Sequence, residues 1–439
     1  MANPIPTLFR IPEVKEKLLF TLLMLVIYRV GAHIIVPGID LQALREYAGQ
    51  LQGTVFGIYD MFVGGGLSRA TVFALGIMPY ISASIMFQLL AAVFPTIERL
   101  QKEGEDGRKK LTQYTRYATV VLAMIQAYGY SVFLESVPGA VVAPGLSFKL
   151  LMLLLLTTGA VFVMWLGEQI TERGIGNGMS LLIFFSIIEQ LPNAFAQTFE
   201  LVNVGEVSWI ALVVLLVVML GVVAATVAVT MAVRKIPVQI PRKVMGRGRI
   251  REGQKSFVPL RMISAGVMPI IFAQSIIIVP ATVAQFSNVG FLNRAANWFA
   301  YGSLPYFITY TVLIVFFTYF YTAIIFNPVD LAENLKKQGA FVPGIKPGAR
   351  TAEYIDRVLS RLSLPGSLFL AAIAIFPYVL LDAFGVPVLG TVLGGTALLI
   401  VVGVALDTVQ QLQQHLLLRR YDGFMRQGRV KFRGRQRYI

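Results

Sequence analysis

The sequence predicts an all-α integral membrane protein of ten transmembrane helices in two inverted five-helix halves, and three observations support this fold class. The first is composition, because 56% of the 439 residues are hydrophobic and only 14% are charged, whereas soluble proteins carry about 25% charged residues. The second is a series of long apolar runs, and the third is a short motif that recurs in the opposite direction. An apolar excess of this size cannot be covered by polar surface in water, so we expect it to face lipid.

Ten apolar runs with few or no charges are long enough to cross the hydrocarbon core of a bilayer, which takes about 20 helical residues. We expect membrane helices over residues 18–36, 71–94, 117–134, 150–167, 178–199, 207–233, 262–285, 304–326, 364–381 and 386–406.

Basic residues lie almost entirely on one side of the predicted membrane. With the N-terminus inside, the inner segments contain 33 of the 38 Lys and Arg residues, the outer segments contain 4, and Arg29 lies within the first span. The net charge of +15 is therefore concentrated on the inner surface. Because basic segments are retained in the cytoplasm, both termini are predicted to be cytoplasmic.

A six-residue motif appears twice, at Gly76–Ile81 in the second span and at Gly266–Ile271 in the seventh, with a spacing of 190 residues. By the predicted orientation the two copies run in opposite directions, which is what two inverted halves would give. The halves would be residues 1–200 and 201–439. Each copy contains a proline, which we expect to kink its helix. The alternative is a chance echo, since Gly and Pro are common in membrane helices.

A short apolar segment, Thr54–Phe62, precedes the second span and leads into three consecutive glycines, Gly64–Gly66. It is too short to cross a bilayer. It could be a re-entrant helix packed inside the protein or an interfacial helix on the membrane surface, and the pattern favours neither.

The residues needed for catalysis or metal binding are scarce in this chain. It has no Cys and only two His, His33 and His415, and it lacks the glycine-lysine motif of a phosphate-binding loop. Arg29 and Glu189 are the charges within the spans, and Asp407 lies at an inner end. A structural ion pair or an interfacial position explains them as well as a proton relay does. We therefore predict a protein that is not an enzyme, with no cofactor and no metal.

Two inner segments are strongly basic. Residues 234–261 contain nine Lys or Arg against Glu252 alone, and the tail over 407–439 contains eight. Such segments could dock RNA, anionic lipid or an acidic protein surface, or could only fix the topology. The loop over 327–363 is mixed in charge and is predicted to be folded, with a helix over 352–362.

Three long strings, Phe73–Ile85, Gly167–Gly178 and Gly339–Ile345, closely resemble the bacterial-type SecY family. The resemblance also covers 102–117 and 319–337, and the order of ten spans follows it over the full length. It implies an hourglass pore between two inverted halves, a plug helix within about 54–70, and a lateral gate that opens to lipid.

Carried over position by position, the resemblance assigns specific residues to these parts. The pore ring would be Ile81, Ile85, Ile183, Ile187, Ile271 and Ile400. The plug would be Tyr59, Asp60, Met61, Phe62, Val63, Gly64, Gly65, Gly66, Leu67 and Ser68. Polar residues of the lateral gate would be Gln88, Gln126 and Gln274, at the seam between the second and third spans and the seventh and eighth.

The resemblance also implies partners: the SecE and SecG subunits, the SecA motor ATPase, the ribosome, signal peptides and nascent chains, and anionic lipids. Docking of the motor or ribosome would use Arg242, Lys243, Arg247, Arg249, Arg251, Lys255, Lys346, Arg350 and Arg357. Lys346 departs from the family pattern, which has Arg there. The charge is kept, but the planar fork that makes bidentate contacts is lost.

The sequence thus predicts a gated channel in the bacterial plasma (inner) membrane, which translocates unfolded secretory chains and releases apolar segments laterally. The alternative is a secondary transporter for a small solute, which is also built from inverted repeats and broken helices. A transporter would need convergent polar groups at the midplane, where this sequence has an isoleucine cluster. A third alternative is an RNA-binding membrane anchor.

Overall fold

The computed structural model of the chain describes residues 12–50, 55–205, 207–239, 244–245, 249–250, 255–263, 266–286, 303–384 and 395–427. The first part contains α2 (Pro12–Gly31), α3 (Leu41–Gln50), α4 (Val55–Phe62), α5 (Met78–Val93), α6 (Pro95–Lys102), α7 (Glu105–Ser136), α8 (Leu146–Arg173), α9 (Gly178–Val204) and α10 (Trp209–Thr230). It is followed by β1 (Val233–Gln239), β2 (Val244–Met245), β3 (Arg249–Ile250), β4 (Lys255–Arg261), α11 (Met268–Phe286), α13 (Leu304–Ile325), α14 (Pro328–Lys337), α15 (Ala349–Phe384) and α17 (Gly395–Gln427).

Long apolar helices dominate the described residues, as predicted. Seven of them, α7 to α10, α13, α15 and α17, are long and apolar enough to cross a membrane, and the pair α5 and α6, bent by 111°, brings the number to eight. They correspond to the predicted second to sixth and eighth to tenth spans. Most of the predicted first span lies in α2, and most of the seventh lies in α11.

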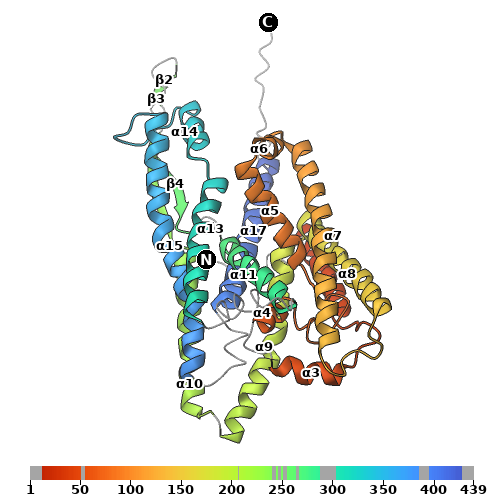
Figure 1. The fold of residues 1–439 in the computed structure, drawn as a ribbon. Coiled ribbons are helices and arrows are strands. Elements are labelled where there is room, and N and C mark those ends of the chain that lie inside the picture. Colours follow the sequence, from red (N-terminus) through yellow and green to blue (C-terminus); the bar gives the residue numbers. More distant parts are fainter. Residues whose placement is uncertain are drawn as a thin grey trace.

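The helices form two groups with α11 between them (Figure 1). On one side α5, α7 and α8 pack together, and on the other α10, α13 and α15 pack together. Helix α11 contacts α5 and α7 of the first group and α13 of the second. One hydrophobic core runs through all of these except α10, and also includes residues of α2, α4, α9 and α17.

The two copies of the repeated motif adopt the same local backbone, but not the expected kinked helix. Gly76 and Gly266 both have positive φ angles, of 53° and 60°, a conformation that glycine adopts readily. Helices α5 and α11 begin two residues later, so Pro79 and Pro269 lie in their first turns. Proline is well tolerated there because the first turn has no intrahelical acceptor for its missing N–H. The glycine turn, rather than a proline kink, interrupts each span.

The segment over 234–261, predicted only as a basic loop, folds largely as a β-hairpin. Strand β1 pairs antiparallel with β4, and β2 pairs with β3. Along β1, Ile236 and Val238 are buried while their neighbours Lys235 and Pro237 are exposed. This period of two is typical of a half-buried strand. The all-α prediction therefore missed one small β element.

The hairpin and the segment over 327–363 form one folded unit, which we call the hairpin module (β1 to β4, α14 and residues 339–363). Gln239 and Phe341 exchange two backbone hydrogen bonds, of 2.9 and 3.0 Å. A separate hydrophobic cluster includes Ile236 and Leu260 of the hairpin, Leu335 of α14 and Ile355 of α15. The helix predicted over 352–362 is the start of α15, which continues without a break through the predicted ninth span.

Candidate functional site

Six isoleucine side chains from four helices lie buried near the centre of the bundle. Each is at most 5% exposed, and all belong to the same hydrophobic cluster. They are Ile81 and Ile85 on α5, Ile183 and Ile187 on α9, Ile271 on α11 and Ile400 on α17. The two pairs are four residues apart, which puts each pair on one helix face. The structure therefore brings the predicted ring residues into one core, and their role as a ring stays a prediction.

The predicted plug lies inside this core. Helix α4 packs against α9 and α11, and Tyr59, Met61, Phe62, Val63 and Leu67 are each at most 5% exposed and share the cluster of the six isoleucines. Burial inside protein fits the re-entrant alternative and not an interfacial helix.

Hydrogen bonds hold the plug segment in its own fold and against the surrounding helices. The carboxylate Oδ1 of Asp60 accepts hydrogen bonds from the backbone N–H groups of Leu67 and Ser68, at 2.8 and 3.0 Å. The hydroxyl of Tyr130 on α7 donates to the carbonyl of Leu67 at 2.5 Å. The plug therefore returns on itself and is tied to α7.

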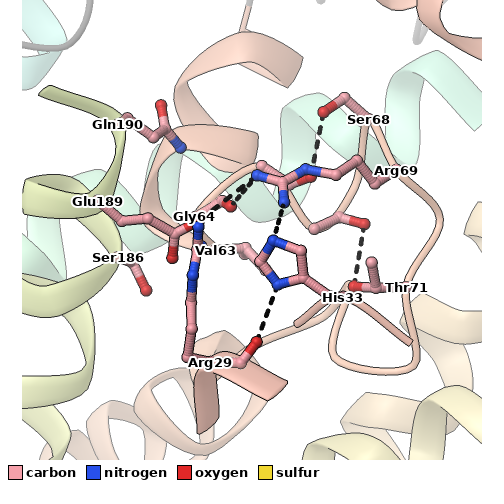
Figure 2. Close-up of polar contacts among 12 residues, drawn as sticks. Arg29, His33, Val63, Gly64, Ser68, Arg69, Thr71, Ser186, Glu189 and Gln190 are labelled. Atoms are coloured by element: carbon pink, nitrogen blue, oxygen red, sulfur yellow. Dashed lines mark hydrogen bonds and ion pairs between the residues drawn. The ribbon is translucent and has the colours of Figure 1, made fainter. Parts of the chain in front are cut away.

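The two charges predicted within the spans, Arg29 and Glu189, form an ion pair between α2 and α9 (Figure 2). Arg69, just after the predicted plug, approaches the same carboxylate, with 3.5 Å from its Nη2 to Oε1 of Glu189. This arrangement fits the structural ion pair rather than a proton relay, because the two guanidinium groups beside the carboxylate are hydrogen-bond donors only and offer no acceptor for a proton.

A hydrogen bond between described residues crosses the predicted gate. The hydroxyl of Tyr321 on α13 donates to the side-chain oxygen of Gln88 on α5, and the Gln88 amide nitrogen donates to Ser84 at 3.0 Å. Gln274 of α11 is 2% exposed and Gln126 of α7 is half-buried. Within the described residues, their Oε1 atoms have no hydrogen-bond partner. The predicted amides therefore border the seam, but they do not bond to one another.

Two cavities share part of their lining, and the smaller one borders both the seam and the predicted ring. One of about 180 Å³ is lined by Ile81, Ile183 and Ile271 together with Gln88 and Tyr321, among others. A larger one, of about 340 Å³, lies between the starts of α9 and α11 and the middle of α17. Its lining is more polar and comprises Asn177, Ser180, Arg261, Val267, Met268, Val404, Asp407, Thr408, Gln410, Gln411 and Gln414. Three of the six predicted ring residues, Ile81, Ile183 and Ile271, therefore line the smaller cavity.

The predicted docking residues fall in and around the hairpin module. Lys346, Arg350 and Arg357 are exposed on it. Arg249 lies in β3 and Lys255 begins β4. Arg242, Lys243, Arg247 and Arg251 lie outside the described residues, as does the end of the basic tail over 428–439.

Comparison with known proteins decides the family. The family model named SecY matches residues 71–409. The protein translocase subunit SecY of Aquifex aeolicus is 44% identical over 433 residues, covering 97% of this chain and 100% of that protein. The chain belongs to the SecY family. The SecY subunit of Escherichia coli K12 is also 44% identical, covering 96% of each chain, and that of Streptomyces griseus is 45% identical over 431 residues.

Solved structures show the same fold over nearly the whole chain. A structure titled as a protein-conducting channel aligns with a TM-score of 0.63 and 17% identity, covering 98% of this chain and 100% of that one. A second, from work on the plug domain of SecY, aligns with a TM-score of 0.65 and 18% identity. The membrane fold predicted from the sequence is therefore that of the SecY family.

Sequence reasoning missed several residues that contact the family's predicted parts. Tyr321 bonds to Gln88 across the seam, Tyr130 bonds to the plug, and Gln190 donates to the plug carbonyls of Asp60 and Met61. Two of them are tyrosines within apolar spans, and a buried tyrosine hydroxyl usually forms a hydrogen bond. That signal marks the residues but does not say which distant segment they bond to.

Proposed function

We propose that this SecY-family chain is a gated channel that translocates unfolded secretory polypeptides across the membrane and releases apolar segments laterally into it. The observation that carries the proposal is the burial of the plug helix and six isoleucines from four helices in one core. A small-solute transporter would instead need convergent polar groups at that point.

The six isoleucines would form the constriction. Aliphatic side chains offer no groups that replace the hydration of an ion, so a closed apolar ring is a barrier to ions. The same side chains bind no particular sequence, which suits a pore that must pass many polypeptides. With the plug packed against them, the resting channel would be sealed.

The seam between α5 and α7 on one side and α11 and α13 on the other would be the lateral gate. Among the described residues, the hydrogen bond from Tyr321 to Gln88 joins the two sides of this seam. Such a bond in a membrane protein stabilises by about 0.5 to 2 kcal/mol. An apolar signal helix that enters the seam gains more than this by burying its side chains. The weak bridge would favour closure at rest and yield to a signal sequence.

The hairpin module would be the docking surface for the ribosome or the SecA motor, which would supply the ATP chemistry. Lys346, Arg350 and Arg357 give it exposed positive charge, which attracts phosphate-rich or acidic partners. Helix α15 continues from the module into the bundle and packs against α13. Docking could thus bias the gate. SecE, SecG and anionic lipids would complete the membrane complex.

We further propose that residues 1–200 and 201–439 are the inverted halves, in the bacterial inner membrane with both termini cytoplasmic. Support comes from the shared backbone of the two motifs, with positive φ at Gly76 and Gly266, and from the one-sided basic charge.

Cysteine scanning tests the channel, because the chain has no Cys. Ile81→Cys or Ile271→Cys should cross-link to a stalled secretory precursor in membrane vesicles. Leu154→Cys, on α8 and 63% exposed, should not, since that face is expected to contact lipid. Absence of cross-links at both isoleucines, or gradient-coupled flux of a small solute, would contradict the proposal.

A further inference from the structure

Charged and polar side chains from α2 and α9 surround the loop that follows the plug helix α4 (Figure 2). At their centre is Glu189 of α9, whose side chain is only 8% exposed. It pairs with Arg29 of α2, and Arg69 of the plug loop lies 3.5 Å from its Oε1. A carboxylate this buried needs charged partners, and here one partner belongs to the scaffold and the other to the plug segment.

Arg69 links the plug loop to both helices. Its Nη2 donates to the carbonyl of Gly64 at 3.0 Å, and its Nη1 lies 3.1 Å from Nε2 of His33. Because a guanidinium can only donate, Nε2 of His33 is the acceptor. Nδ1 of that ring lies 2.9 Å from the carbonyl of Arg29 and is therefore the donor. A chain of contacts thus runs from α2 through Arg69 to α9.

Gln190, the next residue of α9, contacts the plug helix directly. Its Nε2 lies 3.4 Å from the carbonyl oxygen of Asp60 and 3.3 Å from that of Met61, and donates to both. These carbonyls belong to the last turn of α4, where helix carbonyls lack intrahelical partners and the helix dipole is negative. The amide therefore fixes the end of the plug helix.

The plug loop lies close against this face of α9. Gly64 has a φ of 75°, and a β-carbon there would be 3.4 Å from Cβ of Ser186 and 3.5 Å from Oε2 of Glu189. Ser186, Glu189 and Gln190 are spaced i, i+3 and i+4, which puts them on one helix face. Ser186 bonds in turn to Tyr28 of α2 at 2.8 Å. One turn of α9 therefore carries all these contacts to the plug.

We propose that Glu189 and Gln190 are plug-positioning residues, which fasten the plug to α9 in the closed channel. Glu189 acts through Arg69 and Gln190 acts directly on α4. Arg29 keeps the Glu189 carboxylate neutralised when Arg69 leaves, because α2 and α9 both belong to the scaffold. Plug release then breaks one charged contact without leaving a buried charge alone, and the fastening is reversible. The inference rests on the proposed channel function.

The test compares the same change at two interhelical ion pairs whose carboxylates are largely buried, in the full-length chain in membrane vesicles. Glu189→Gln removes the charge at the plug. Glu168→Gln is the matched control, because Glu168 of α8 pairs with Arg116 of α7 through two bonds of 2.8 Å and its side chain is 12% exposed. The reporter of plug release is maleimide labelling of Met61→Cys, at a plug position that is 3% exposed in this structure.

We expect Glu189→Gln to raise the labelling rate of the Cys at position 61 about tenfold, since bonds to charged groups are among the stronger ones. Gln190→Ala should raise it about fivefold through the loss of two neutral bonds. Glu168→Gln should leave it within about twofold of the parent. A second reporter, Ala194→Cys, lies on α9 and is 1% exposed. Its labelling should not change in any variant.

Unchanged labelling at position 61 in both α9 variants, or an equal rise at position 194, would overturn the inference. If Glu189→Gln does not accumulate, Gln190→Ala decides, because it leaves no buried charge unpaired. The proposed function fails separately: it is wrong if the parent chain, in the same vesicles with its partners, does not translocate an unfolded precursor. A parent that translocates, with both α9 variants labelling at the parent rate, contradicts the inference alone.

Discussion

The proposed plug and the proposed gate seam lie on the same hydrophobic core but are held by very different numbers of polar contacts among the described residues. The plug segment is bonded to itself through Asp60, to α7 through Tyr130 and to α9 through Gln190. At the seam one described hydrogen bond, between Tyr321 and Gln88, joins α13 to α5. Gln126 and Gln274 border the seam with side-chain oxygens that have no partner among the described residues.

The difference indicates that the two regions have separate functions, the plug in sealing the channel and the seam in admitting apolar segments. A seal against ions must persist at rest, so many contacts around the plug are useful. A gate that admits an apolar segment must separate at low free energy, so few polar contacts are useful there. Changes near the plug should therefore alter ion leak, and changes at the seam should alter the response to signal sequences.

The largest effect is expected from a charge in the region shared by plug and seam. Ile271 is 3% exposed, belongs to the core and lines the smaller cavity. Ile271→Asp should destabilise the closed state by at least about 3 kcal/mol, because it buries an unpaired carboxylate, and should abolish the seal in vesicle conductance measurements. Ile271→Val, with an expected loss near 1 kcal/mol, is the control. A tight channel carrying the aspartate would show that this site is not part of the constriction.

A smaller effect is expected on the plug side alone. Tyr130→Phe removes the hydroxyl that bonds the carbonyl of Leu67, at a loss of about 0.5 to 1.5 kcal/mol. The carbonyl keeps its hydrogen bond from the backbone N–H of Ala70 at 3.1 Å. Ion leak in reconstituted vesicles should rise, while the minimum signal hydrophobicity required for translocation should change little. If Tyr130→Phe instead changed the signal hydrophobicity required for translocation without raising ion leak, it would contradict the assignment of the seal to the plug side and of the signal response to the seam.

The corresponding change on the seam side is Tyr321→Phe. Loss of its bond to Gln88 should destabilise the closed gate by about 1 kcal/mol. Precursors with weakly hydrophobic signals should be translocated several-fold better, with little added leak. Tyr319→Phe is a matched control, since the hydroxyl of Tyr319 bonds to the Ser360 carbonyl and not across the seam. Equal behaviour of the two variants would argue against a specific bridge.

The smallest effect should have the opposite sign. Gln274 is 2% exposed, and its Oε1 lacks a partner within the described residues. Gln274→Leu replaces this group with an apolar one of similar volume and should stabilise the closed seam by about 0.5 to 1 kcal/mol. Release of a marginal membrane segment into lipid should slow in a cross-linking time course. Faster release would mean that the amide bonds to something in the closed state.

The parts that the sequence predicted are those governed by local pattern. Apolar length gives the spans, and the Gly-x-Met-Pro motif marks where two of them are interrupted. Even there the expected proline kink was wrong. Each interruption is a turn at a glycine with positive φ, Gly76 or Gly266, and the helix that follows begins with Pro79 or Pro269 in its first turn. The β1 strand was missed because Arg234, Lys235 and Pro237 mask the alternation of Ile236 and Val238.

The sequence by itself determined a basic, multi-pass membrane protein of the SecY family, and it predicts ten spans with the basic charge on one side. Bilayer thickness, charge asymmetry and family motifs are all readable from residue order. Tertiary structure alone decided which groups meet. Glu189 and Gln190 face the plug, Tyr321 reaches Gln88, and the two inner segments share one hydrophobic cluster. Such pairings join residues far apart in the sequence, and they depend on how helices pack rather than on any local pattern.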